Sequence, residues 1–302
     1  MATSTPTPRA GLRARAAMNA SIEMPTGAGW RYVAGRIGRS LFTLLISAVV
    51  LTVAWYVALK LLDANAFIAK TPLDVVKYLF VKNPLMTMSP ADIRHTLWNL
   101  LLVTLYHAGI GFVGGVVGSV IVSVLFTLIR PLEFMFMPLA MLLRTVPLLA
   151  MAPVIYLVLG QGAATAGFIG GVVVFFPLLV NLTLGFRSVS AQSVDLIRVY
   201  GGNRWTIMTK VAFPNALPHF FASMRIAVPG ALTGAMLYEW LFTFQGLGGV
   251  ISQAKTNSNY GQIWAIVVLI TVVAIVFYTI TTFIEAAVLA KWGPNAGKAV
   301  TK

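Results

Sequence analysis

The sequence predicts an all-α integral membrane protein with six transmembrane helices. Hydrophobic residues make up 58% of its 302 residues and charged residues only 10%, whereas a soluble domain normally carries about a quarter charged residues. Six apolar runs are each long enough to cross the hydrocarbon core, which takes about 20 helical residues. The net charge of +14 is explained by basic residues on the cytoplasmic side of the membrane, so we expect no nucleic-acid partner.

The chain begins with a polar segment, residues 1–29, that we expect to be a disordered cytoplasmic tail. It is rich in Thr, Pro, Ala and Arg and has no apolar period. It is not a cleavable signal peptide, because the first apolar run starts near Leu41 and is too long for one. In residues 30–39, apolar side chains share one helical face beside three arginines. This pattern predicts a short helix in the membrane interface or, equally, a basic flank of the first span.

The transmembrane domain is expected to cover residues 40–290 and to be followed by a cytoplasmic tail, 291–302. Its apolar runs are 40–62, 97–128, 134–159, 164–186, 221–243 and 262–289. Pro131 separates the second run from the third, because proline ends one helix and suits the start of another. Glycines at four-residue spacing in the second, fourth and fifth runs predict close packing of helices.

Between the first two runs, residues 63–96 are more than a simple loop. Thr71 and Pro72 are followed by Asp74 and by apolar residues at helical spacing, and proline suits the first helical turn. We therefore expect a short helix on the outer surface.

The orientation follows from the lysines and arginines. With the N-terminus inside, the inner segments hold most of the basic residues. These are Arg9, Arg13, Arg15, Arg31, Arg36, Arg39, Arg130, Arg187, Arg198, Arg204, Lys210, Arg225, Lys291, Lys298 and Lys302. The prediction is a multi-pass protein with both termini cytoplasmic.

The most informative stretch of the chain lies inside the predicted loop 187–220. A helix is predicted from about Ser193 to Tyr200, ending at Gly201-Gly202, where positive φ costs little. After Asn203, a second helix is predicted from Arg204 to Phe213 and a stop at Pro214. Two short helices at an angle form a rigid element that can transmit a push from a soluble partner. An ordinary amphipathic linker is the alternative.

The residue spacing of this stretch resembles that of the loop by which ABC importer permeases bind their ATPase. In that family an acidic residue is followed six positions later by glycine, and a large apolar residue and proline come further on. Here those places hold Asp195, Gly201, Phe213 and Pro214, although the two alanines usual after the acid are absent. The resemblance implies that Asp195, Arg198, Gly201, Gly202, Asn203, Arg204 and Pro214 couple the chain to an ATPase.

Two further segments are similar to the nitrate, sulfonate and taurine branch of this family. They are the stretch from Arg144 to Pro153 in the third run and Gln245-Gly-Leu-Gly-Gly249 in an outer loop. The resemblance implies a bacterial inner-membrane permease that pairs with a second permease, identical or different. It also implies two ATPase subunits, which bind ATP and magnesium, and an extracytoplasmic solute-binding protein.

The chain itself offers no catalytic constellation and no cofactor site. It lacks a phosphate-binding Gly-x-x-x-x-Gly-Lys motif, so it is not the ATPase. It has no cysteine, and its three histidines show no metal-ligand spacing. We expect His107, inside the second run, to make a hydrogen-bonded contact between helices.

Charged residues at membrane depth are costly and are therefore candidates for the solute pathway or a gate. Arg144 lies in the third run near Pro147; it could favour an anion or bond to carbonyls that Pro147 frees. Glu239 follows Tyr238 near the outer end of the fifth run; it could hold a gate or the packing there, or meet a cationic group.

Two classes of function remain for such a chain. The first is the permease of an ATP-driven importer, for a small anion such as a sulfonate, taurine or nitrate, or for a vitamin or pyrimidine precursor. The second is a stand-alone channel or secondary carrier, which would typically show an internal repeat and ionisable residues at midplane. The sequence shows no internal repeat and few buried carboxylates, which favours the first class.

Overall fold

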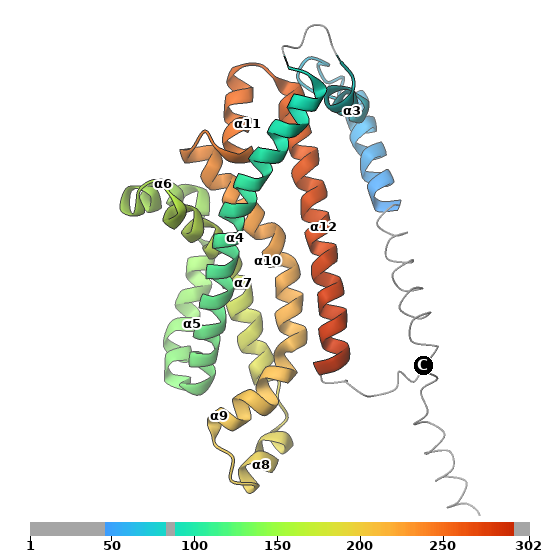
Figure 1. The fold of residues 1–302 in the computed structure, drawn as a ribbon. Helices are drawn as coiled ribbons and strands as arrows, with labels where there is room; N and C mark the ends of the chain where they lie inside the picture. Colours follow the sequence, from blue (N-terminus) through green and yellow to red (C-terminus); the bar gives the residue numbers. More distant parts are fainter. Residues whose placement is uncertain (1–45, 83–87, 293–302) are drawn as a thin grey trace, which may run out of the picture. The chain divides into compact units, whose positions relative to one another are not determined.

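The computed structural model describes residues 46–82 and 88–292, and every regular element within them is helical (Figure 1). The all-α membrane fold class is confirmed. The predicted tail 1–29, the predicted interfacial helix 30–39 and residues 293–302 of the predicted C-terminal tail lie outside the described residues.

The chain divides into two compact units, residues 1–64 with 298–302, and residues 65–297. The described part of the first unit contains the apolar helix Ile46–Leu61. The second unit contains α3 (Pro72–Phe80), α4 (Pro90–Leu128), α5 (Arg130–Thr145), α6 (Leu148–Leu159), α7 (Ala163–Arg187), α8 (Ala191–Val199), α9 (Arg204–Ile207), the π-helix η1 (Met208–Ala212), α10 (Phe213–Phe242), α11 (Gly246–Thr256) and α12 (Tyr260–Trp292).

Among the described residues, four helices are long and apolar enough to span a membrane: α4, α7, the continuous helix Arg204–Phe242, and α12. A fifth is added when α5 and α6 are counted as one bent span. The first of the six predicted runs, 40–62, is described only from residue 46.

The third predicted run, 134–159, is not a continuous helix. Its two halves, α5 and α6, meet at an angle of 104°. The break falls at Val146, which has the extended conformation (φ −69°, ψ 127°) that steric conflict imposes on a residue before proline. Pro147 supplies that restriction, and its own nitrogen has no hydrogen to continue the helix.

The core of the second unit lies among α4, α7 and α10. Small and aliphatic side chains fill it, with Ala108 from α4, Val174 and Leu178 from α7, and Ala231 and Ala235 from α10. Gly111 lets the backbones of α4 and α7 approach closely: a Cβ built on it would lie 2.8 Å from the Cα of Gly170. The predicted glycine contact between these helices is therefore present.

The predicted short helix after residue 70 is α3. Its N-terminus carries a reciprocal cap, in which the Thr71 hydroxyl accepts from the Asp74 N–H and the Asp74 carboxylate accepts from the Thr71 N–H. The Thr71 hydroxyl also donates to the Asp74 carboxylate at 2.7 Å. This bond, followed by that from the Thr71 N–H, lowers the pKa of Asp74. Val75 and Tyr78 are buried and fix the helix to the bundle.

The second helix of the predicted loop does not stop at Pro214. It continues through η1 into α10, so that one helix runs from Arg204 to Phe242. The Phe213 N–H bonds to the Met208 carbonyl five residues back. This widened turn directly precedes Pro214 and relieves the clash that its ring would make with an ordinary helical turn.

Candidate functional site

The first candidate site is the segment of α8 and α9, which projects from one end of the bundle, away from α3 and α11 (Figure 1). α8 ends as predicted at Gly201, whose φ is +77°. The Gly202 N–H donates to the Ile197 carbonyl (2.8 Å), and the Gly201 N–H donates to the Arg198 carbonyl (2.9 Å). This pair of bonds satisfies the last carbonyls of the helix and fixes the turn.

The start of α9 is fixed equally well. The Asn203 side chain accepts hydrogen bonds from the backbone N–H and the hydroxyl of Thr206, at 2.8 and 3.0 Å. Arg204 then donates to the carbonyl of Leu128, the last residue of α4, at 3.3 Å. Because both helix ends at the turn are capped and α9 is tied to α4, the segment is a rigid element.

The outer face of this segment is apolar and open. Val199 and Tyr200 are 84% and 83% exposed, and Trp205 is 58% exposed. Asp195 and Arg198 form an ion pair at 3.4 Å, but both are exposed, so the pair adds little stability. Exposed apolar side chains around a rigid turn are typical of a surface that binds another protein.

The structure therefore gathers six of the seven predicted coupling residues, Asp195 to Arg204, within two short helices and their turn. Pro214 is the exception, because it lies in the first turn of α10.

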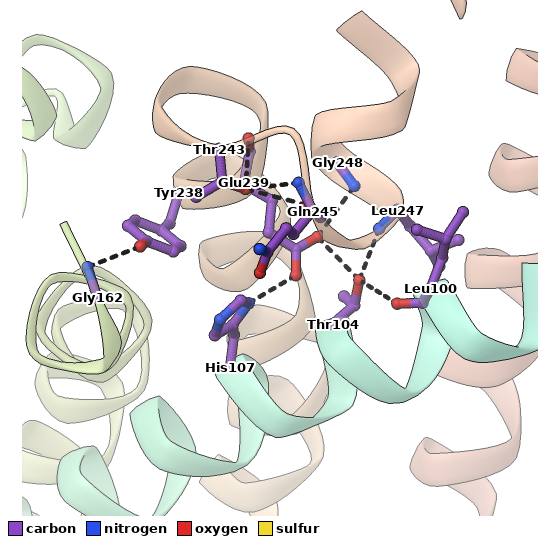
Figure 2. Close-up of polar contacts among 10 residues, drawn as sticks. All are labelled: Leu100, Thr104, His107, Gly162, Tyr238, Glu239, Thr243, Gln245, Leu247 and Gly248. Carbon is purple, nitrogen blue, oxygen red and sulfur yellow. Dashed lines mark hydrogen bonds and ion pairs between the residues drawn. The ribbon is translucent and has the colours of Figure 1, made fainter. Parts of the chain in front are cut away.

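The second candidate site is a buried polar cluster around Glu239, where α4, α10 and α11 meet (Figure 2). Glu239 is 0% exposed and His107 is 9% exposed. The Nδ1 atom of His107 lies 2.8 Å from one carboxylate oxygen of Glu239. The expected hydrogen-bonded contact of His107 is thus confirmed.

The other carboxylate oxygen of Glu239 binds two further donors. It accepts from the Thr104 hydroxyl at 2.8 Å and from the Gly248 N–H at 3.0 Å. The Leu247 N–H donates to the same Thr104 hydroxyl at 2.9 Å. Glu239 and Thr104 therefore satisfy free N–H groups at the start of α11, where negative charge is favoured.

Tyr238 lies beside this cluster with a different partner. Its hydroxyl accepts from the Gly162 N–H at 3.0 Å, before the first turn of α7, and its ring meets the His107 ring edge-on at 5.3 Å. Arg144 and Pro147 are elsewhere, in the last turn of α5 and at the break before α6. Within the described residues, the Arg144 guanidinium has no hydrogen-bond or ion-pair partner.

Sequence reasoning missed every partner of Glu239, because it expected a contact of His107 between helices without naming the group that His107 meets. Thr104 stands three residues before His107 on the same face of α4, which was the available signal. The N–H groups of Leu247 and Gly248 were hidden, because residues 245–249 resembled an outer loop and instead begin α11.

Ion pairs near the opposite end of the bundle were missed as well. Arg187 pairs with the buried Glu133 at 2.5 Å, and Arg225 pairs with Glu285 at 2.8 Å. Within the described residues no group of acids and histidines could hold a metal ion.

Several bundled helices that are long and apolar enough to span a membrane define a multi-pass membrane protein. Residues 128–292 match the family described as binding-protein-dependent transport system inner membrane component. Because that match covers more than half of the chain, the chain belongs to this family.

The relatives include permeases of several ABC importers. The aliphatic sulfonates transport permease protein SsuC of Bacillus subtilis is 26% identical over 82% of this chain and 86% of its own length. The nitrate import permease protein NrtB of Synechocystis is 23% identical over 81% and 88%. The riboflavin transport system permease protein RibX of Chloroflexus aurantiacus is 26% identical over 82% and 88%. The predicted resemblance to the nitrate, sulfonate and taurine branch is confirmed.

Solved structures show the same fold. The inward-facing MetNI methionine ABC transporter is similar with a TM-score of 0.52 and 20% identity, over 67% of this chain and 99% of that one. An amino acid ABC transporter crystallised with histidines gives a TM-score of 0.53 and 15% identity, over 67% and 100%.

Proposed function

We propose that this chain forms the solute pathway of an ATP-driven importer and that the segment from Asp195 to Arg204 engages a partner ATPase. The observation that carries the proposal is the rigid turn at Gly201, which presents Val199 and Tyr200 to solvent at one end of the bundle. The turn is joined to a membrane-spanning helix without a break, since α9 continues through η1 into α10. A push on the turn therefore reaches the span directly.

The proposed orientation places this segment and both termini in the cytoplasm, because most lysines and arginines fall on that side. The proposed assembly contains a second permease, two ATP- and magnesium-binding subunits and an extracytoplasmic solute-binding protein. Membership of a family of ABC importer components favours this assembly over a stand-alone channel or carrier.

We further propose a small anion as the solute, such as a sulfonate, taurine or nitrate. The guanidinium of Arg144 is exposed at the kink before Pro147, and it makes no bond to a described carbonyl. Its structural alternative, bonding to carbonyls that Pro147 frees, therefore has no support. In this proposal Tyr238 and Glu239 hold the outer gate rather than contact the solute, because both are buried in helix contacts.

The coupling proposal is tested with Gly201→Pro and Arg204→Glu in proteoliposomes that contain the ATPase and the binding protein. Proline demands a φ near −65°, which the Gly201 turn cannot supply. We expect solute uptake and solute-stimulated ATP hydrolysis to fall to background, with normal expression. The matched charge reversal Lys291→Glu, at an exposed position in the last turn of α12, should retain both. Wild-type uptake by both loop variants would remove this segment from coupling.

The solute proposal is tested with Arg144→Gln in the same vesicles. A lower affinity or rate for the transported anion is expected. Unchanged uptake kinetics would exclude Arg144 from the pathway.

A further inference from the structure

A pocket of about 790 Å³ lies between the α8–α9 segment and the ends of α4, α5 and α7. Two of its lining residues, Arg198 and Arg204, belong to the proposed coupling segment, but the coupling proposal assigns no occupant to the pocket itself. Its lining contains one acidic residue, Glu133, and four arginines. These are Arg130, Arg187, Arg198 and Arg204.

The positive charge of this pocket is only partly balanced. Glu133 is buried and pairs with Arg187 at 2.5 Å, which neutralises one guanidinium. Arg204 donates to a backbone carbonyl, which leaves its charge uncompensated. Arg130 has no ion-pair or hydrogen-bond partner within the described residues. Arg198 pairs with Asp195 at 3.4 Å. Within the described residues, the pocket therefore presents two guanidinium groups without an acidic partner, those of Arg130 and Arg204.

The start of α5 adds to this preference for negative charge. Its N-cap residue, Ile129, makes no side-chain cap. Pro131 has no N–H and the Leu132 N–H donates to the Ile129 carbonyl at 3.0 Å, so the contribution of this helix end comes mainly from its dipole. Ile129, Arg130 and Pro131 all line the pocket. The positive end of a helix dipole therefore points at the same space as the arginines.

The rest of the lining is largely apolar, and part of it is open. Phe134 is 74% exposed and Ile129 is 45% exposed. They lie where the apolar helices α4 and α5 end and begin, which is the depth at which hydrocarbon gives way to headgroups. An inorganic anion gains nothing from apolar side chains beside the arginines. An amphiphile with a charged headgroup can contact both.

We propose that this pocket binds the phosphate headgroup of an anionic phospholipid, with Arg130 as a principal contact and the acyl chains lying along Phe134. Basic pockets between helices on the cytoplasmic side of membrane proteins recognise such headgroups, and guanidinium groups bind phosphate through paired hydrogen bonds. The inference rests on the proposed orientation. The ATPase is a poorer occupant, because Val199 and Tyr200, the exposed apolar residues proposed to contact it, do not line the pocket.

Such a lipid would connect α5 to the α8–α9 segment. Arg130 belongs to α5, whereas Arg198 and Arg204 belong to α8 and α9, so one phosphate would join them. The lipid would then hold the coupling segment against the bundle.

The test uses the purified permease alone in detergent, without ATPase or binding protein, so that a failure of coupling does not affect it. Native mass spectrometry would count bound phosphatidylglycerol, with phosphatidylcholine as the neutral comparison. We expect Arg130→Gln to weaken phosphatidylglycerol binding about tenfold, the scale of one charge-assisted contact. Arg130→Lys should retain part of it. Lys210→Gln, which removes an exposed charge outside the pocket, is the matched control.

Three outcomes would overturn the proposal. Equal binding of phosphatidylcholine would show that the pocket does not distinguish an anionic headgroup from a neutral one. Equal loss with Lys210→Gln would show general attraction to a basic surface. Displacement of the lipid by millimolar inorganic phosphate would assign the pocket to a free anion. Because Arg130 is exposed and unpaired within the described residues, Arg130→Gln should fold normally, and its elution on size exclusion checks this.

Discussion

The carboxylate of Glu239 lies 3.0 Å from the backbone nitrogen of Gly248. The first residue is near the end of α10 and the second is in the first turn of α11. The same carboxylate also meets His107 of α4. One fully buried side chain thus joins three helices, and its removal would free several buried donors at once.

We predict that Glu239→Ala destabilises the bundle by about 3 kcal/mol, because breaking a buried charged network leaves its partners unsatisfied. Glu239→Gln keeps the shape and one acceptor oxygen, so its loss should be smaller. Thermal unfolding in detergent, followed by circular dichroism, measures both. Equal stability of wild type and Glu239→Ala would show that the network contributes nothing.

The second prediction compares two glycines of α4. Gly111→Ala should destabilise the protein, since its Cβ would lie 2.8 Å from the Cα of Gly170 and backbone cannot move aside cheaply. Gly114→Ala should be neutral or stabilising by up to about 1 kcal/mol, because nothing lies within 4 Å and alanine favours a helix. The difference in unfolding midpoint between the two variants tests the packing of α4 on α7.

The third prediction concerns orientation. The chain has no cysteine, so Asn203→Cys introduces a single thiol at the exposed start of α9. The thiol should react with a membrane-impermeant maleimide only after the cells are opened. Labelling of intact cells would show that the α8–α9 segment lies outside, which is the reverse of the proposed topology.

The fourth prediction follows from Tyr78 in α3. Burial raises the pKa of its phenol above 10.0, against the lowering effect of its hydrogen bond with Asn259. A raised folded pKa means that the packing of Tyr78 is fully favourable below the unfolded pKa and is lost as pH rises through the folded pKa. Absorbance of tyrosinate should therefore include a phenol that ionises at higher pH than an ordinary tyrosine, and Tyr78→Phe should remove that component. If the variant and the wild type titrate alike, Tyr78 is not buried as described.

Local chemistry made some of these elements predictable from sequence. The end of α8 at Gly201 and the cap of α3 at Thr71 depend on residues close in the chain, and their signals are strong. The His107 contact followed from the cost of a polar ring among apolar neighbours.

Other features depend on how turns of helix adjust and on distant partners. Pro214 predicted a stop, but the π turn of η1 absorbs it and the helix continues. Pro147 lies at a 104° bend between α5 and α6 and not within a straight helix. The partners of Glu239 come from Thr104, 135 positions earlier, and from a backbone N–H of α11, which no short sequence pattern encodes.

The unbroken helix from Arg204 to Phe242 has 39 residues and so a length of about 58 Å at 1.5 Å per residue. Glu239 lies within its last turn. A rod of this length works as a lever: a tilt of about 5° around one end shifts the other by about 5 Å. A shift of that size would break the 3.0 Å hydrogen bond between the Gly248 N–H and the Glu239 carboxylate. If the Gly201 turn moves while Glu239 keeps its contacts with α4 and α11, the helix must flex between them, at Pro218 or Pro229.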